Sequence, residues 1–348
     1  MKLDALRFDR PPELQASLPA EMRGVDRDGV RLLVSSHEGH AHRRFRDLPE
    51  LLSPGDLLVV NESGAMPASL QARGRLGDFI LNLSTNYGRG LWLAEARWSQ
   101  AKQGPLPLVE GEAFEAAGLP VRLVSTYPGL PRLAFVHIEG DVVSTMALHG
   151  RPIRYGYVNQ GLPLSAYQTA FSRVPGSAEM PSAARPFTQR VIEAIAARGV
   201  GIAKILLHTG VSSLEVESEA IENQPLYPEP FEVPSETAAA VNAARARGSR
   251  VIAVGTTVVR ALESAHDGKK IRPARGFTRL YVNPYRPVRA VDGILTGFHD
   301  PVTTHLAMMY AVAGETRVRA AYSAAIAEGY HWHEFGDSHL LWGPAAAA

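Results

Sequence analysis

The feature that most constrains the fold is a change of sequence pattern near residue 160. From residue 61 to about 158, short β-forming segments recur between glycines and prolines, and helical periodicity is scarce. From about residue 160 onward, apolar segments of strand length alternate with segments of helical periodicity, which is typical of an α/β domain. The two patterns together predict a mixed α/β chain in which a small β-barrel interrupts the α/β domain.

Local patterns predict the individual elements of both parts. We assign residues 1–60 and 159–348 to the α/β domain and residues 61–158 to the inserted barrel-like domain. In the barrel we expect strands over residues 79–83, 90–96, 121–124 and 132–138. In the α/β domain we expect strands over residues 31–34, 56–60, 202–207, 251–254 and 293–297. Helices are expected over residues 188–198, 235–247, 257–265 and 304–313, with Ser235 capping the second, and one further helix within residues 11–60.

Composition limits the chemistry more than it limits the fold. The 348 residues include no cysteine, which excludes disulfides, thiolate metal sites and a cysteine nucleophile. The first residues lack the apolar core of a signal peptide, and no apolar run approaches the ~20 residues of a membrane helix. We therefore expect a cytoplasmic protein with no membrane contact. The sequence leaves the oligomeric state open, and a monomer is the simpler expectation.

Charge is unevenly distributed along the chain, although the formal net charge is only +1. Residues 211–240 carry seven Glu and no Lys or Arg, whereas residues 241–290 carry eleven Lys or Arg against two acidic residues, a local net charge of +9. Such a basic band suits the phosphate backbone of a nucleic acid. The alternative is a solvated face whose charge the preceding acidic segment neutralises. The sequence alone leaves both interpretations open.

The sharpest local feature is the segment VIAVGTTVVR at residues 251–260. A buried strand ends at Gly255, and Thr256 and Thr257 open a helix that carries Arg260 about one turn further on. The free N–H groups at a helix start favour an anion, and Arg260 would strengthen the attraction. The alternative is an ordinary strand–turn–helix in which Arg260 forms a salt bridge.

The same segment carries a family resemblance. Residues 255–264, GTTVVRALES, resemble the signature GTT-x-VR-x-LES of the S-adenosylmethionine:tRNA ribosyltransferase-isomerase family of the queuosine pathway. Further segments resemble family motifs in the same order along the chain, at residues 42–48, 54–61, 67–68, 167–169, 175–176, 207–210, 291–292, 298–299, 330 and 335–337. Because the matches span residues 42 to 337 in one order, they are far more specific than any single motif.

The resemblance implies both a fold and a reaction. The family fold is an α/β domain with an inserted β-barrel. The family reaction transfers and isomerises the ribosyl part of S-adenosylmethionine onto 7-aminomethyl-7-deazaguanine in tRNA. It yields epoxyqueuosine and releases adenine and methionine. S-adenosylmethionine is therefore the expected ribosyl-donating substrate and tRNA the expected partner, with no metal implied.

Site residues are carried over from the matching motifs. The catalytic candidates are His208, His299 and Asp337, of which the two histidines are imidazoles for proton transfer or hydrogen bonding. The turn at Gly255 is expected to hold an anionic part of a substrate, either the methionine carboxylate or a tRNA phosphate. The full set of substrate-binding candidates is Asn61, Pro181, Ser182, Gly210, Gly255, Thr256, Thr257 and Arg260.

The chain also departs from the family pattern. Pro186, Gln224 and Tyr227 stand where the pattern has histidines, and Gly297 stands where it has asparagine. The motif around His299 gains an acid, Asp300, and a histidine, His305. Two alternatives therefore stay open: a divergent paralog that uses S-adenosylmethionine on another nucleoside acceptor, and a non-catalytic RNA-binding protein.

Two clusters of histidines raise a separate alternative, a zinc or nickel site. The first cluster is HEGHAH at residues 37–42, and the second runs from residue 331 to 339. The first lies among arginines, so a solvated basic turn is the competing interpretation. In the second, Asp337 already matches a family motif for which no metal is expected.

Overall fold

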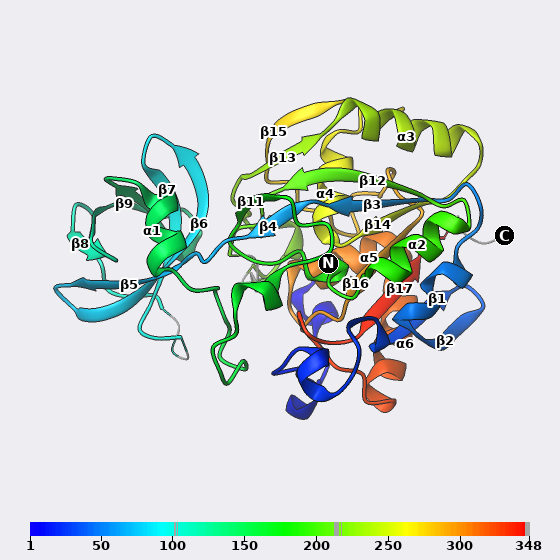
Figure 1. Ribbon diagram of the computed structural model, residues 1–348, viewed down its shortest axis with the longest axis horizontal. Helices are drawn as coiled ribbons and strands as arrows, with labels where there is room; N and C mark the ends of the chain where they lie inside the picture. Colours follow the sequence, from blue (N-terminus) through cyan, green and yellow to red (C-terminus); the bar gives the residue numbers. More distant parts are fainter. Residues whose placement is uncertain (101, 103, 212–215, 217, 345–348) are drawn as a thin grey trace.

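The computed structural model describes residues 1–100, 102, 104–211, 216 and 218–344. It contains a nine-stranded mixed sheet with helices packed on it, on the right in Figure 1, and a closed six-stranded barrel on the left. The barrel strands all lie between Ser69 and Ile138, inside the sequence of the larger α/β unit. The predicted fold class, an α/β domain with an inserted barrel, is therefore confirmed. The domain boundaries at residues 61 and 158 stay a prediction.

The large sheet is parallel at its centre. Strands β12, β3, β14 and β16 run parallel to one another, and β17 runs antiparallel to β16. In spatial order the strands are β15 (Ala274–Thr278), β13 (Glu229–Val233), β12 (Gly201–Leu207), β3 (Leu57–Asn61), β14 (Val251–Val254), β16 (Gly293–Gly297), β17 (Ser338–Trp342), β1 (Arg31–Ser36) and β2 (Gly39–Arg44). Ligands of open α/β sheets bind at the carboxyl ends of such parallel strands.

Both faces of the central strands are buried, and alternate residues serve different cores. Val59 of β3 packs with the core beneath the helices α3 (Ser235–Ala246), α4 (Thr256–Ser264), α5 (Thr304–Ala313) and α6 (Glu315–Ala327). Its neighbours Leu58 and Val60 pack with α2 (Gln189–Ala197) on the other face. This explains why the central strands read as continuous apolar runs without alternation.

The predicted element positions were mostly close, with two corrections. The strands at residues 251–254 and 293–297 and the helix at 304–313 have the predicted bounds. The predicted cap at Ser235 is wrong, because α3 follows Pro234 directly and Ser235 is its first residue. The single helix predicted within residues 11–60 is replaced by several short helical segments. The structure has short 3₁₀ segments there, the longest being Phe45–Leu51, with Pro49 inside it.

The barrel closes around its own apolar core of residues such as Phe79, Leu81 and Trp92. Its strands, in order around the barrel, are β10 (Leu130–Ile138), β7 (Leu91–Arg97), β6 (Gly77–Gly88), β5 (Ser69–Gly74), β8 (Ala113–Ala116) and β9 (Leu119–Tyr127). Helix α1 (Val142–His149) follows the last barrel strand and packs on the same core through Met146. The short parallel pair β4 (Ser63–Ala65) and β11 (Val174–Ser177) lies where the chain passes between the two parts.

None of the helices in the described part of the chain is both long and apolar enough to cross a lipid bilayer.

Candidate active site

A cavity of about 470 Å³ lies beside the carboxyl ends of β14 and β16. Its wall combines the start of α4, the end of β16 with the residues that follow it, part of the segment 152–157 after the barrel, and the loop at His333 and Glu334. Arg132 from barrel strand β10 also lines it. The cavity is therefore built by both parts of the molecule.

Seven of the site residues predicted from sequence line this cavity: Pro181, Ser182, Gly255, Thr256, Thr257, Arg260 and His299. They come from three separate segments of the chain that the fold brings together. Their proximity supports a common site, and their individual roles stay predictions.

The start of α4 depends on the backbone geometry of Gly255. This residue has φ +96° and ψ 160°, a conformation that a side chain would strain, and its N–H donates to the Leu295 carbonyl at 2.8 Å. The turn sends the chain from β14 directly into α4, so Thr256 and Thr257 form part of the cavity wall. The partial positive charge of a helix start therefore faces the cavity.

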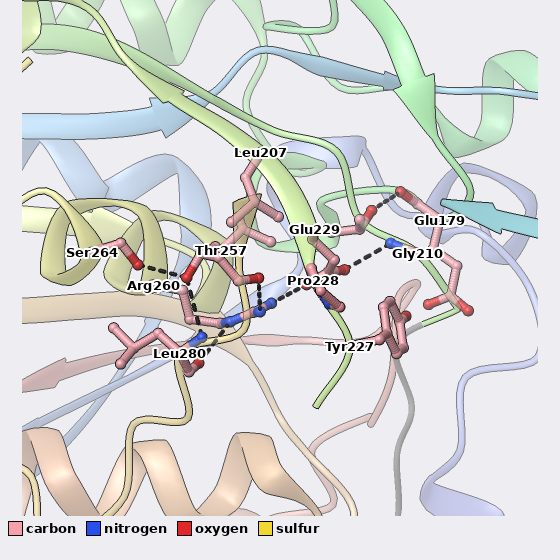
Figure 2. A network of polar contacts seen from close by, with 12 residues as sticks. Glu179, Leu207, Gly210, Tyr227, Pro228, Glu229, Thr257, Arg260, Ser264 and Leu280 are labelled. Carbon is pink, nitrogen blue, oxygen red and sulfur yellow. Dashed lines mark hydrogen bonds and ion pairs between the residues drawn. The ribbon is translucent and has the colours of Figure 1, made fainter. Parts of the chain in front are cut away.

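Arg260 is held by a buried carboxylate. One guanidinium nitrogen of Arg260 donates to Glu229, and its Nε donates to the Leu280 carbonyl at 3.1 Å. The second oxygen of Glu229 accepts the Gly210 N–H at 2.7 Å, so each oxygen of the carboxylate has its own donor, as Figure 2 shows. The salt bridge is the arrangement that the alternative interpretation of this segment expected. Arg260 still lines the cavity, but as half of an ion pair rather than as an isolated cation.

Asn61 and Gly210 support the cavity from behind. Asn61 is buried, accepts the N–H groups of Ser63 and Leu207 at 3.1 Å each, and donates to Thr257 Oγ1 at 3.3 Å. A Cβ at Gly210 would lie 2.3 Å from Ser84 Oγ, so only glycine fits there. Both residues therefore position other groups and do not line the cavity themselves, as far as the described residues show.

The catalytic interpretation of His208 and Asp337 is not supported by their positions, because neither is among the described residues that line the cavity. His208 Nδ1 lies 2.7 Å from Ser63 Oγ at the β4–β11 junction, and burial lowers the pKa of its imidazole. Asp337 accepts the backbone N–H of Arg31 at 2.7 Å and of His331 at 2.8 Å. These contacts join chain segments, and a catalytic role for either residue stays a prediction.

His299 is the predicted catalytic residue that does line the cavity. Its Nε2 lies 2.9 Å from Thr296 Oγ1, and its ring centre lies 4.9 Å from that of His305. Burial, together with the neighbouring His305, lowers the pKa of His299 well below its ordinary value. Burial and the charge of Arg260 lower the pKa of His305 to about 4. Both imidazoles are therefore neutral at pH 7, and the burial that keeps them neutral also makes them weaker bases than an exposed imidazole.

An aromatic wall of the cavity was not found from the sequence. The rings of Tyr155 and Tyr157 lie 5.8 Å apart and nearly parallel, and Tyr157 stacks on His333 at 4.5 Å. The Tyr157 hydroxyl donates to Glu334 at 2.5 Å, and burial raises the pKa of that carboxyl group. Residues 152–157 form no helix or strand, so no periodicity marked them. The spacing Tyr-x-Tyr was the one signal available.

An acidic side chain, Asp300, adjoins the aromatic wall through His333. Asp300 Oδ2 lies 2.8 Å from His333 Nε2, and Arg10 Nε donates to Asp300 Oδ1 at 2.9 Å. Burial opposes ionisation of Asp300, but the hydrogen bond from His333 and the charges of His333 and Arg10 hold its pKa below the ordinary value. Asp300 is therefore an anion at neutral pH, beside the cavity that it lines.

Comparison with known proteins places the chain. A family model described as Queuosine biosynthesis protein matches residues 3–341. The chain belongs to that family. It is 38% identical to the S-adenosylmethionine:tRNA ribosyltransferase-isomerase of an Anaeromyxobacter species, over 98% of this chain and 99% of the relative. It is 37% identical to the protein of the same name from Thermus thermophilus, over 97% of this chain and 99% of the relative. The resemblance inferred from the motifs is thus confirmed.

A solved structure agrees with the same assignment. The crystal structure of S-adenosylmethionine tRNA ribosyltransferase from Thermotoga maritima is similar, with a TM-score of 0.54 and 27% identity. The match covers 97% of this chain and 99% of that chain, so the barrel and the large sheet are both included.

The three residues that replace family histidines do not line the main cavity, although Tyr227 and Pro186 line smaller hollows that adjoin it. Tyr227 is buried and donates to the Val211 carbonyl, Gln224 accepts the Ser218 N–H at 3.3 Å, and Pro186 lines a small neighbouring hollow. None of the three is among the described residues that line the main cavity. In contrast, Asp300 and His305 line it directly. The cavity has therefore gained titratable groups relative to the family pattern.

The two histidine clusters have other partners. His42 Nδ1 lies 2.8 Å from the Tyr330 hydroxyl, and both His40 and His339 contact Ser35 Oγ, at 3.0 and 2.8 Å. Within the described residues, no group of three or more His, Cys, Asp or Glu side chains is arranged to hold a metal ion.

Proposed function

We propose that this protein is an S-adenosylmethionine:tRNA ribosyltransferase-isomerase. It would transfer and isomerise the ribosyl group of S-adenosylmethionine onto 7-aminomethyl-7-deazaguanine in tRNA, giving epoxyqueuosine and releasing adenine and methionine. The observation that carries the proposal is the end-to-end match to relatives of that name, at 38% identity over 98% of the chain. Because the proposed substrate is tRNA, we expect the reaction to take place in the cytoplasm.

The charge of the cavity supports a cationic substrate. S-adenosylmethionine carries a sulfonium and an ammonium group, and the acceptor base carries an aminomethyl group. The carboxyl groups of Glu179, Glu229, Asp300 and Glu334 line the cavity, against the two guanidinium groups of Arg132 and Arg260. Two of these carboxylates are already paired with arginines, Glu229 with Arg260 and Asp300 with Arg10, so the excess of negative charge is small. A partly buried site of this kind stabilises positive charge more strongly than water does.

The neutral imidazoles supply a proton acceptor. The reaction requires removal of a proton next to the sulfonium, and a neutral imidazole inside the cavity suits that step. His299 is the proposed base, with His305 beside it at 4.9 Å between ring centres. Thr296, which lies 2.9 Å from His299 Nε2, orients the ring.

The start of α4 is the proposed site for the methionine carboxylate. Gly255, Thr256 and Thr257 line the cavity where the helix begins, and such a start binds anions. Arg260 contributes less than the sequence suggested, because Glu229 already pairs with it. The flat Tyr155–Tyr157 wall is the proposed surface for a purine-type ring.

The gain of Asp300 and His305 in the cavity favours one alternative, a divergent paralog that uses S-adenosylmethionine on another nucleoside acceptor. Calorimetry separates the alternatives. Binding of S-adenosylmethionine without tRNA favours the divergent paralog, and binding of tRNA without S-adenosylmethionine favours a non-catalytic RNA-binding protein.

The function is tested by complementation. The chain is expressed in bacteria that lack their own enzyme of this family, and digested tRNA is examined by mass spectrometry. We expect epoxyqueuosine or queuosine to appear with the wild-type chain and to be absent with a His299→Gln variant of equal abundance. Absence of both nucleosides with the wild-type chain would contradict the proposal.

A further inference from the structure

An exposed aromatic side chain stands at the free edge of the large sheet. Strand β15 pairs only with β13 within the described chain, so its outer edge is open, as Figure 1 shows. Phe277 of this strand is 54% exposed. Its ring centre lies 5.6 Å from that of Tyr87 in barrel strand β6. The edge of the sheet and the barrel therefore meet at this aromatic pair.

The pair continues into the molecule as a row of rings. Tyr87 lies 5.9 Å from Phe135, and Phe135 lies 5.5 Å from Tyr127. The hydroxyl groups of Tyr87 and Tyr127 donate to carbonyls of the segment before β13, at Pro228 and Leu226. These hydrogen bonds hold the rings of Tyr87 and Tyr127 in place. The exposed ring of Phe277 therefore packs against a ring whose orientation is fixed.

Cationic side chains surround Phe277. Arg275 and Arg279 lie two residues to either side, and both are exposed. Arg89 is exposed in the turn after β6, two residues from Tyr87. We call Tyr87, Arg89, Arg275, Phe277 and Arg279 the β15 patch. Arg275 has one weak partner, Glu232 at 3.6 Å, while Arg89 and Arg279 have no carboxylate within ion-pair distance in the described residues.

Among the acidic residues that the structure describes between positions 211 and 240, only two form ion pairs with the basic band. Glu229 and Glu232 pair with Arg260 and Arg275. Three further arginines of the band pair with aspartates elsewhere: Arg245, Arg250 and Arg272. Within the described chain, no carboxylate lies within ion-pair distance of the other six members of the band, which are Arg247, Lys269, Lys270, Arg279, Arg286 and Arg289. Because these six cationic side chains have no acidic partner among the described residues, the interpretation of the basic band as a phosphate-binding surface is favoured over that of a neutralised face.

The β15 patch lies next to the cavity through the strand register. Thr278 pairs with Glu229, which lines the cavity, and the Thr278 carbonyl accepts from Arg260 at 3.4 Å. Side chains alternate along a strand, so Phe277, the preceding residue, points away from that ion pair. A nucleic acid lying over Phe277 would thus be on the opposite face of β15 from that ion pair, and because β15 is the edge strand it would reach the cavity around this edge.

We propose that the β15 patch binds the single-stranded part of tRNA beside the nucleotide that enters the cavity. Phe277 stacks on a neighbouring base, and Arg89, Arg275 and Arg279 contact the phosphates. Unpaired RNA bases stack on aromatic rings, and arginines follow the backbone, which is the combination present here. The inference rests on the proposed function, since it names where that function's tRNA substrate docks.

The test compares tRNA binding by wild type, Phe277→Ala and Arg279→Gln, using purified tRNA that carries the precursor base. We expect Phe277→Ala to weaken tRNA binding about tenfold, the loss typical of one stacked base. Arg279→Gln should weaken binding several-fold and reduce the slope of log affinity against log salt by about 0.7, the value for one contact to a single strand. Binding of S-adenosylmethionine, measured by calorimetry, should not change.

Matched controls lie elsewhere on the surface. Leu148→Ser removes an exposed apolar side chain from α1, and Arg43→Gln removes an exposed arginine from β2, at the opposite edge of the sheet. Neither should alter tRNA affinity. If wild type binds tRNA and both β15 variants bind it equally well, the patch proposal is wrong while the proposed function stands.

Two other outcomes also overturn the proposal. If wild type binds no tRNA, both the proposed function and the patch fail. If Phe277→Ala dissociates a dimer in ultracentrifugation without changing tRNA binding, the patch is an interface between copies of this chain.

Discussion

The cavity and the β15 patch are neighbouring regions that differ in whether their charged side chains are paired. In the cavity, carboxylates and cations are held by partners, as Glu229 is by Arg260 and Gly210. On the patch, Arg89 and Arg279 extend into solvent, and no carboxylate pairs with them in the described residues. Chemistry on a charged substrate benefits from fixed, desolvated groups, whereas binding of a polyanion benefits from exposed cations. The contrast indicates a division between reaction and docking.

The largest effect on turnover is expected from replacing His299, and it tests whether the cavity acts separately from the patch. Replacing it with Gln removes the proposed proton acceptor, and general base catalysis is typically worth about 10²–10⁴-fold. Turnover should fall at least about 100-fold at saturating substrates, while tRNA affinity stays as in wild type. His149→Gln on the exposed end of α1 serves as the control. A parallel loss of tRNA affinity in His299→Gln would show that cavity and patch are not separate.

The second effect concerns stability in acid, which distinguishes the buried sheet from the exposed patch. His339 in β17 is fully buried, and burial, with a smaller contribution from His40, lowers its pKa to about 3. Below the ordinary histidine pKa, the unfolded chain binds a proton that the folded chain refuses, so stability falls as the pH drops.

This one side chain should cost several kcal/mol of unfolding free energy, on the order of 3–6 kcal/mol, between about pH 7 and pH 3. Denaturant unfolding at a series of pH values measures it. His339→Gln should flatten the dependence, while Arg279→Gln should leave it unchanged. Equal pH dependence in wild type and His339→Gln would refute the burial account.

A third, smaller effect is expected at the aromatic wall. Tyr157→Phe keeps the stacked ring but removes the hydroxyl that donates to Glu334. Loss of a hydrogen bond to a buried carboxyl group costs about 1.5–3 kcal/mol of unfolding free energy. Because Glu334 then loses the partner that positions it beside the cavity, the KM for S-adenosylmethionine should also rise. Steady-state kinetics measure it, with Tyr285→Phe, an exposed tyrosine outside the cavity, as the control. An unchanged KM would remove this wall from the substrate site.

The smallest effect, a change in tRNA affinity, tests how far the docking surface extends beyond the β15 patch. Arg286 belongs to the basic band but lies outside the β15 patch. Arg286→Gln should reduce tRNA affinity by about twofold at moderate salt, through general attraction to phosphates. A loss as large as that in Arg279→Gln would show that the docking surface extends along the whole band.

The central strands and the turn at Gly255 could be predicted because their signals are local. A buried run such as residues 251–254 followed by Gly and two Thr specifies strand, turn and helix within ten residues. Strands β13 and β15 could not be found in this way, because neither is a continuous apolar run and their pairing depends on segments far apart in the sequence. Helix α6 could not be predicted either, because its many alanines weaken its apolar periodicity.

The site was predictable only where a motif carried it. His299 and the start of α4 lie in matching motifs and line the cavity. His208 and Asp337 also lie in matching motifs, yet their polar atoms are occupied by Ser63 and by backbone N–H groups. Motif membership did not separate residues that face the cavity from residues that hold segments together. Only the three-dimensional contacts made that distinction.

The most direct test of the central claim is the release of adenine from S-adenosylmethionine by purified protein. Two tRNA samples are compared, one carrying 7-aminomethyl-7-deazaguanine and the other guanine at the same position. The account predicts that adenine, methionine and epoxyqueuosine form in equal amounts with the first sample, and that none forms with the second. No adenine release with the first sample, or adenine release without modified tRNA, would contradict it.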